Sequence, residues 1–278
     1  MSPASRPLAQ ARSLLFVPGN RPERFAKALA SGADAVILDL EDAVPAADKA
    51  AARVAIAAQW PALREQGVPL LLRINAPGSD DWRPDLMLLD RLPGLAGLIC
   101  PKVETQAALA ALAPHRVPLL PLIESARGWA ALAEIAAAPG VLRLVLGHID
   151  FMADTGIACD PEDSAERELA PLRFALAMHT RIAGLAPAID GVTVQTGDAA
   201  RLREDVLRAR RYGFGAKLCI HPQQVEGVHA AFRPSEQELD WARRVIAADA
   251  AANGAAVQLD GRMVDLPVVL RARRLLEL

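Results

Sequence analysis

The 278-residue sequence predicts a (β/α)8 barrel followed by a short C-terminal helical extension. Short apolar runs recur eight times along the chain, and alanine-rich segments of helical character separate them. The runs are apolar throughout, as expected for strands of a parallel sheet that is covered on both faces. Eight such strands alternating with helices favour a closed barrel over an open sheet.

The elements follow one another in a regular order. The predicted strands are Ser13–Val17, Ala35–Leu40, Leu70–Ile74, Leu98–Cys100, Leu119–Ile123, Leu142–Leu146, Ala186–Ile189 and Ala216–Ile220. The helix candidates between them include Arg24–Ala30, Ala47–Gln59, Gln106–Leu112, Ala130–Ala137, Ser164–Ala183 and Ala199–Arg211. With 52% hydrophobic residues, the chain can bury a large core.

The pattern changes after the eighth predicted strand. Ser235 and Glu238 have the spacing of a helix N-cap and its capping box, and Asn253 with the following glycine ends that helix. A strand-like segment, a loop and a short helix complete the tail. We therefore expect a catalytic barrel over residues 1–232 and an extension over residues 233–278. The extension is too small for a domain and is expected to pack on the barrel or on a neighbouring subunit.

Composition excludes several classes of protein. Lys and Arg number 31 against 33 Asp and Glu, which argues against a nucleic-acid partner. No apolar run reaches the ~20 residues that a membrane helix needs, and the N-terminus lacks the apolar segment of a secretory signal. Cys100, Cys159 and Cys219 are odd in number and far apart, unlike a disulfide framework or a zinc ribbon. These features predict a soluble, cytoplasmic protein that binds neither nucleic acid nor membrane.

Several common catalytic motifs are absent. The sequence contains no G-x-S-x-G, Walker A, H-E-x-x-H or C-x-x-C motif. Serine-type hydrolysis, phosphoryl transfer by a P-loop and zinc catalysis therefore have no support. Nearly every predicted strand instead ends in polar or charged residues, including Asn75, Lys102, His148, Asp190 and His221. Since the active site of a (β/α)8 barrel lies at these strand ends, we expect a shared polar pocket there.

Carboxylates are prominent at the predicted strand ends: Asp39, Glu41, Asp42, Glu124 and Asp150. Glu124 and Asp150 would close successive strands and be neighbours in a barrel. Two adjacent carboxylates repel each other unless a cation lies between them, and Mg²⁺ suits such oxygen ligands. The alternative stays open that Glu124 caps the following helix and Asp150 pairs with an arginine.

Arg73 ends an otherwise apolar strand, and a guanidinium at the barrel mouth needs an anion. That anion is either a substrate carboxylate or an internal partner, Asp39 or Glu41, and the residues alone do not decide. His221 lies just past the eighth strand, where a pocket position and an ordinary loop position fit equally. Asp265 lies in the tail and, taken alone, fits a turn or helix-capping residue.

Motifs along nearly the whole chain carry a resemblance to a known family. They are Arg12–Gly19, Gly32–Val44, Leu72–Asn75, Pro101–Glu104, Ile123–Ala126, Gly147–Phe151, Lys217–Val225 and Gly261–Asp265. In this order they resemble the citrate lyase β-subunit family of the HpcH/HpaI aldolase/citrate lyase superfamily, which includes malyl-CoA and citramalyl-CoA lyases.

The resemblance implies a (β/α)8 barrel in homotrimers, with Mg²⁺ at the mouth. It also implies a carbon–carbon lyase that cleaves a citryl-, malyl- or citramalyl-CoA thioester to a keto acid and an acetyl-type thioester. Oxaloacetate, glyoxylate and pyruvate stay open as the keto acid. Two other activities stay open: hydrolysis of a malyl-type CoA ester, and work within a citrate lyase complex on a carrier-protein thioester.

The resemblance also implies roles for individual residues. Glu124 and Asp150 match the Mg²⁺ ligands, and Arg73 matches the residue that holds the keto-acid carboxylate. Asp265 matches an aspartate that reaches the active site of an adjacent subunit and exchanges a proton with the enolate carbon.

Further positions match the surroundings of the family's active site. Positions that match the substrate and coenzyme A pocket are Phe16, Arg21, Lys27, Ile220 and His221. Asp39 is expected near the metal, with Glu41 beside it. Ile149 stands where many relatives carry a small or acidic residue, which bears on substrate choice.

Overall fold

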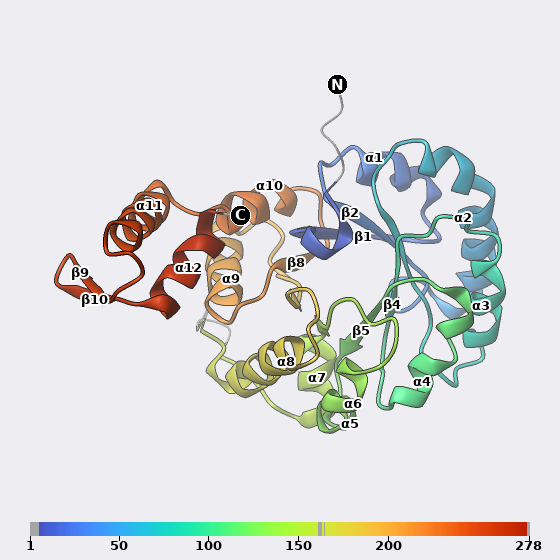
Figure 1. The fold of residues 1–278 in the computed structure, drawn as a ribbon. Coiled ribbons are helices and arrows are strands. Elements are labelled where there is room, and N and C mark those ends of the chain that lie inside the picture. Colours follow the sequence, from blue (N-terminus) through green and yellow to red (C-terminus); the bar gives the residue numbers. More distant parts are fainter. Residues whose placement is uncertain (1–5, 161–162, 164, 277–278) are drawn as a thin grey trace. The chain divides into compact units, whose positions relative to one another are not determined.

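A computed structural model describes residues 6–160, 163 and 165–276. The chain divides into two compact units, Met1–His229 and Ala230–Leu278 (Figure 1). Their boundary falls shortly before the boundary predicted at residue 233.

The first unit is built on a closed barrel of eight parallel strands, which confirms the predicted fold class (Figure 1). Each strand pairs with the next along the chain, and β8 closes onto β1. The strands are β1 (Ser13–Pro18), β2 (Ala35–Asp39), β3 (Leu70–Arg73), β4 (Gly97–Cys100), β5 (Leu119–Ile123), β6 (Val145–Leu146), β7 (Ile189–Asp190) and β8 (Ala216–Cys219).

Helices surround the strands. They are α1 (Phe25–Leu29), α2 (Lys49–Arg64), α3 (Trp82–Leu89), α4 (Gln106–Ala110), α5 (Ala126–Ala130), α6 (Leu132–Ala136), α7 (His148–Thr155), α8 (Ala170–Ile182), α9 (Ala199–Arg211) and α10 (Gln224–Phe232). Short 3-10 turns are η1 (Leu8–Gln10), η2 (Pro22–Arg24), η3 (Ala46–Asp48), η4 (Ala113–His115) and η5 (Arg167–Leu169). The sequence patterns missed α3, α7 and α10.

Two strands are shorter than predicted. β6 and β7 begin only at Val145 and Ile189, and the buried side chain of Arg143 bonds backbone carbonyls near their starts. Its Nε donates to Pro187 O (2.7 Å), and its Nη1 donates to Ala11 O (2.7 Å). The segment before β7 keeps a backbone bond to its neighbour, from the Ala186 N–H to Leu142 O (3.1 Å), and Pro187 has no N–H with which to extend the pairing.

Two helix boundaries also differ from prediction. The helix expected over Ala130–Ala137 is split into α5 and α6, and α5 begins earlier because Ser125 Oγ accepts the Gly128 N–H (3.1 Å). The start predicted at Ser164 lies outside the described residues, and α8 begins at Ala170.

Alternation along the strands sorts side chains between the barrel interior and the helices. The buried interior is apolar: Ala11, Leu14, Ala35, Ile37, Leu71, Ile99, Leu120, Leu122, Val145, Ile189, Ala216 and Leu218. Two positions beyond Leu14, Ile37, Leu71 and Leu122 stand Phe16, Asp39, Arg73 and Glu124. These four therefore form the next interior layer, toward the carboxyl ends of the strands, where barrel enzymes place their active sites.

The second unit pairs α11 (Glu236–Ala251) with α12 (Leu266–Leu276) and the antiparallel hairpin of β9 (Val257–Leu259) and β10 (Arg262–Val264). Its core includes Ala242, Val245 and Val269. The predicted capping box is present. Among the described residues, no helix has the length and apolar character needed to cross a membrane.

We expect Ser235→Ala to weaken α11. Ser235 Oγ accepts the Glu238 N–H (3.2 Å), and Glu238 Oε2 accepts the Ser235 N–H (2.8 Å). Losing an N-cap costs about 1 kcal/mol, so amide exchange in the first turn of α11 should accelerate roughly fivefold. Ser235→Asp keeps an acceptor and should exchange like the unmodified protein. Equal exchange in all three proteins would contradict a stabilising role for the cap.

Candidate active site

A pocket of about 260 Å³ lies within the first unit and combines charged groups with an apolar wall. Its lining residues are Phe16, Pro18, Asp39, Ala43, Arg73, Leu122, Glu124, Leu146, Gly147, His148, Ile149, Asp150, Val192, Leu218 and Ile220. The pocket therefore sits directly on the charged interior layer of the barrel.

Many of the residues expected at the site line this pocket together: Phe16, Asp39, Arg73, Glu124, Ile149, Asp150 and Ile220. Arg21 lies outside the lining and pairs with Glu23 (2.6 Å), and Lys27 is exposed on α1. His221 also lies outside it, and its Nδ1 accepts the Gln223 N–H (3.3 Å). Asp265 belongs to the second unit.

Arg73 is held by two carboxylates. Its Nε and Nη2 donate to the two oxygens of Asp39 (2.7 and 2.6 Å), and its Nη1 lies 2.9 Å from Glu41 Oε2. The guanidinium also lies 4.8 Å from the centre of the Phe16 ring. Burial alone would lower the pKa of Arg73, but the hydrogen bonds and charge of Asp39 raise it above its usual range. The internal salt bridge is thus present, and further N–H groups of Nη1 and Nη2 remain for a ligand.

Glu124 lines the pocket with an unsatisfied oxygen. Its Oε1 accepts the Lys102 N–H (2.7 Å), while its buried Oε2 has no hydrogen-bond partner among the described residues. Burial, followed by the charge of Glu41, raises the pKa of Glu124 to about 8, and Asp150 adds to the effect. The alternative of a helix cap is wrong, because Ser125 caps α5.

Asp150 does not close a strand, contrary to the prediction. β6 ends at Leu146, and Asp150 lies in the first turn of α7. No ion pair between Asp150 and an arginine occurs in the part of the chain that the structure describes. Within that part there is also no group of three or more candidate metal ligands. Glu124 and Asp150 can therefore supply two oxygen ligands to a hard cation such as Mg²⁺, with water and substrate oxygens completing the coordination.

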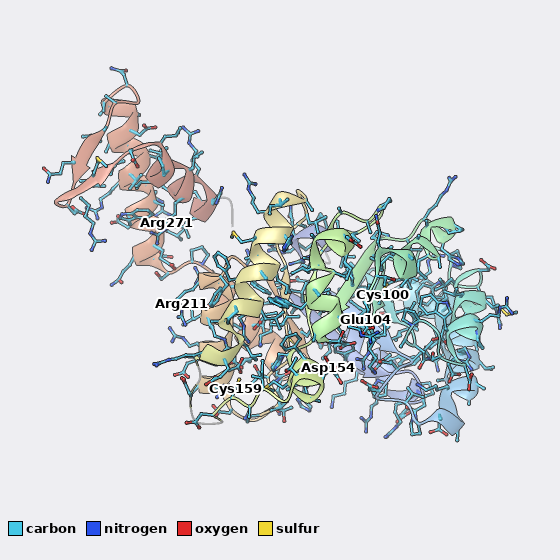
Figure 2. All side chains as sticks on the ribbon, turned by 90° about the horizontal axis from the view of Figure 1, so that it is seen from below. Cys100, Glu104, Asp154, Cys159, Arg211 and Arg271 are labelled. Carbon is cyan, nitrogen blue, oxygen red and sulfur yellow. The ribbon has the colours of Figure 1, made fainter. Side chains whose placement is uncertain are left out.

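The surroundings of Glu124 fix its position. A Cβ atom on Gly147 would lie 2.7 Å from Glu124 Oε2 and 2.6 Å from its Cβ, so only glycine fits beside the carboxylate. The residues that follow Glu124, at the start of α5, are bonded by Glu104 and Asp154, which are labelled in Figure 2. Ser125 Oγ donates to Glu104 Oε1 (2.9 Å), and Asp154 Oδ2 accepts the Ala126 N–H (2.7 Å).

His148, expected among the polar residues at the strand ends, lines the pocket, whereas Gly147 was not expected there. Burial lowers the pKa of His148 to about 4, so its imidazole is neutral at pH 7. A side chain at Gly191 would collide with that imidazole. In the sequence, a glycine directly after a strand indicates that another group packs closely against the backbone there. It does not identify that group, which is Glu124 at Gly147 and His148 at Gly191.

Asp190 was expected at the polar pocket and is not in its lining. It follows Ile189, which faces the barrel interior, so Asp190 points outward. There it lies 3.2 Å from Lys217 Nζ and 3.4 Å from Arg173 Nε. Burial would raise the pKa of Asp190, but these cations lower it well below its usual range.

We expect Gly147→Ala to impair Mg²⁺ binding, because the added methyl group would displace Glu124. The loss of affinity should be roughly 10–100-fold, as for other changes that reorient a metal ligand. Isothermal titration with MgCl₂ measures it. Gly197→Ala is the matched control, since a Cβ there meets no atom within 4 Å. Equal affinity in both variants would refute the role of Gly147.

Comparison with known proteins agrees with this architecture. The family model described as HpcH/HpaI aldolase/citrate lyase matches residues 12–222. A "Citrate lyase subunit beta-like protein" from Mycobacterium tuberculosis (strain CDC 1551 / Oshkosh) is 41% identical over 266 residues, covering 94% of this chain and 93% of that protein. A "(3S)-malyl-CoA thioesterase" from Cereibacter sphaeroides (strain ATCC 17029) is 35% identical, covering 95% and 93%.

A solved structure is similar over the same extent. The crystal structure of CitE from Mycobacterium tuberculosis in complex with magnesium, acetoacetate and coenzyme A superposes with a TM-score of 0.87 at 38% identity. It covers 97% of this chain, which in turn covers 98% of that structure. The matching motifs, the closed barrel and these relatives agree: the chain belongs to the HpcH/HpaI aldolase/citrate lyase family.

Proposed function

We propose that the protein is a Mg²⁺-dependent CoA-ester lyase that cleaves a 3-hydroxyacyl thioester to a keto acid and an acetyl-type thioester. One observation carries the proposal: Arg73 and the pair Glu124 and Asp150 line a single pocket. This arrangement suits a ligand with a carboxylate next to a second oxygen. The similar CitE structure contains magnesium, a keto acid and coenzyme A together.

The residues of the pocket have separable tasks. Arg73 binds the substrate carboxylate through its remaining N–H groups and thereby orients the carbon–carbon bond to be broken. Glu124 and Asp150 would hold Mg²⁺, which when bound polarises the substrate oxygens. Phe16, Val192 and Ile220 provide apolar surface for the rest of the substrate. Cleavage releases the hydroxyl proton and leaves the electron pair on the thioester enolate, whose carbon must then gain a proton.

Asp265 is the proposed donor of that proton. It stands between β10 and α12 and is half-buried, and its carbonyl oxygen accepts the Val269 N–H (3.0 Å). No side-chain hydrogen bond of Asp265 is found within the described segments. We propose that a second copy of the chain, in a homotrimer, supplies this carboxyl group to the barrel pocket. An Asp265 tail favours a stand-alone enzyme over a subunit that depends on a carrier protein.

A thioesterase is the second candidate function. The relative from C. sphaeroides bears that activity in its name. In this case water attacks the thioester carbonyl, the carbon–sulfur bond breaks, and the carbon skeleton stays intact. Arg73 and the carboxylate pair would bind the malyl group in the same way.

A product assay separates the two reactions. The protein is incubated with Mg²⁺ and citryl-, malyl- or citramalyl-CoA, and keto acid and free thiol are measured separately. Keto acid without thiol is the expected result and also identifies the acyl group. Thiol without keto acid would establish the thioesterase instead. If neither keto acid nor thiol forms from any of the three esters, both activities on free CoA esters are contradicted. A carrier-protein thioester would then be the next substrate to test.

We expect Glu124→Gln and Asp150→Asn to abolish Mg²⁺-dependent turnover, because each removes an anionic ligand. Mg²⁺ affinity should fall by more than the roughly 100-fold typical of changes around a metal ligand. Asp198→Asn is a matched carboxyl-to-amide control, since Asp198 only caps α9. Turnover that persists with either ligand variant would contradict the assigned metal site.

We expect Asp265→Asn to lose turnover while keeping Mg²⁺ and pyruvate affinity, because the residue acts after binding. Each single variant, Asp265→Asn and Glu124→Gln, should be inactive alone. Co-expressed and co-purified, they should regain part of the activity, since some pockets then combine an intact metal site with an intact Asp265. Full turnover of Asp265→Asn would show that Asp265 takes no part in the reaction. If the co-expressed variants stay inactive, Asp265 does not act on the pocket of another subunit.

A further inference from the structure

Lys102 follows β4 and adopts a backbone conformation that its side chain disfavours. Its φ is +50°, in the left-handed region where glycine is preferred. Strained positions of this kind persist where surrounding contacts hold them. Lys102 is not in the pocket lining. It contacts the proposed metal ligand Glu124 directly and reaches Arg73 through Glu41.

The backbone and the side chain of Lys102 bind different carboxylates. The backbone N–H donates to Glu124 Oε1 (2.7 Å). The ammonium donates to Glu41 Oε1 (2.7 Å) and lies 3.6 Å from Asp42. Its side chain is 44% exposed, whereas that of Glu41 is 5% exposed. The pair is thus a buried carboxylate held by a cation at the barrel mouth.

The charge of this ammonium matters for Arg73. The other oxygen of Glu41 lies 2.9 Å from Arg73 Nη1, and Asp39 occupies Nε and Nη2. Arg73 with Asp39 and Glu41 carries a net charge of −1, which Lys102 offsets; with Asp42, 3.6 Å from the ammonium, the wider cluster is at −1 and would be at −2 without Lys102. Without Lys102, an incoming carboxylate would meet a more negative group and would compete with Glu41 for Arg73.

We infer that Lys102 is a positioning residue that keeps Arg73 available to a ligand carboxylate by holding Glu41. The inference rests on the proposed function, in which Arg73 binds the keto-acid carboxylate. It has a consequence that general loosening of the site would not produce. Removing the ammonium leaves the backbone bond to Glu124 intact and makes the site more negative, so anion and cation affinities should respond differently.

Lys102→Met in the full-length protein tests this. Pyruvate affinity, titrated at saturating Mg²⁺, should fall roughly tenfold, the scale of one lost charge-assisted hydrogen bond. Mg²⁺ affinity, titrated without keto acid, should stay unchanged or increase. Lys102→Arg keeps the positive charge and should recover most of the pyruvate affinity.

Two glycine variants separate the effect of the ammonium charge on ligand affinity from the effect of backbone strain. Lys102→Gly removes both the ammonium and the strain, and it should lose pyruvate affinity like Lys102→Met. Arg116→Gly relieves a similar strain at an exposed position (φ +53°) and should leave both affinities unchanged.

The outcomes are distinguishable. Unchanged pyruvate affinity in Lys102→Met overturns the inference. A parallel loss of Mg²⁺ and pyruvate affinity also overturns it, because that result indicates a purely structural role. An unmodified protein that binds neither Mg²⁺ nor pyruvate overturns the proposed function itself and the premise of the inference with it.

Discussion

The closure of β8 onto β1 is the constraint on which the site depends. Leu14 of β1 pairs with Ala35 of β2 on one side and with Leu218 of β8 on the other. Closure fixes the register of every strand, so that side chains two residues apart stack in interior layers. The apolar layers fill the barrel, and the first layer above them contains Asp39, Arg73 and Glu124. Charged groups from strands far apart in sequence thereby meet over a dry core.

Two buried carboxylates of this barrel show how neighbours decide their chemistry. Asp190 lies between Lys217 and Arg173, which lower its pKa despite its burial. Glu124 is also buried, but Glu41 and Asp150 repel its charge and raise its pKa to about 8. The first carboxylate already has cationic partners, and these ion pairs tie β7 and β8 to α8. The second lacks a cationic partner for Oε2, and a bound cation would stabilise it, which is why a metal site is expected at Glu124.

Arg143 and Arg73 are contrasting buried arginines. Arg143 bonds backbone carbonyls of Leu8, Ala11 and Pro187, and burial lowers its pKa to about 9. Arg73 bonds carboxylates, which keep it fully charged. One guanidinium thus satisfies chain segments whose carbonyls lack strand partners. The other holds a positive charge at the pocket, where its charge balance is shared with Glu41 and Lys102.

Local sequence determined the barrel's strands, the capping box at Ser235 and most of the pocket's charged residues. These depend on apolar runs, short-range spacing and residue type, which act within a few positions along the chain. Tertiary structure decided the direction of Asp190, the place of Asp150 on α7, and the close fit of Gly147 against Glu124. It also linked Lys102 to Glu41, 61 residues earlier. Such contacts arise from strand register and from the packing of distant segments, neither of which a linear pattern contains.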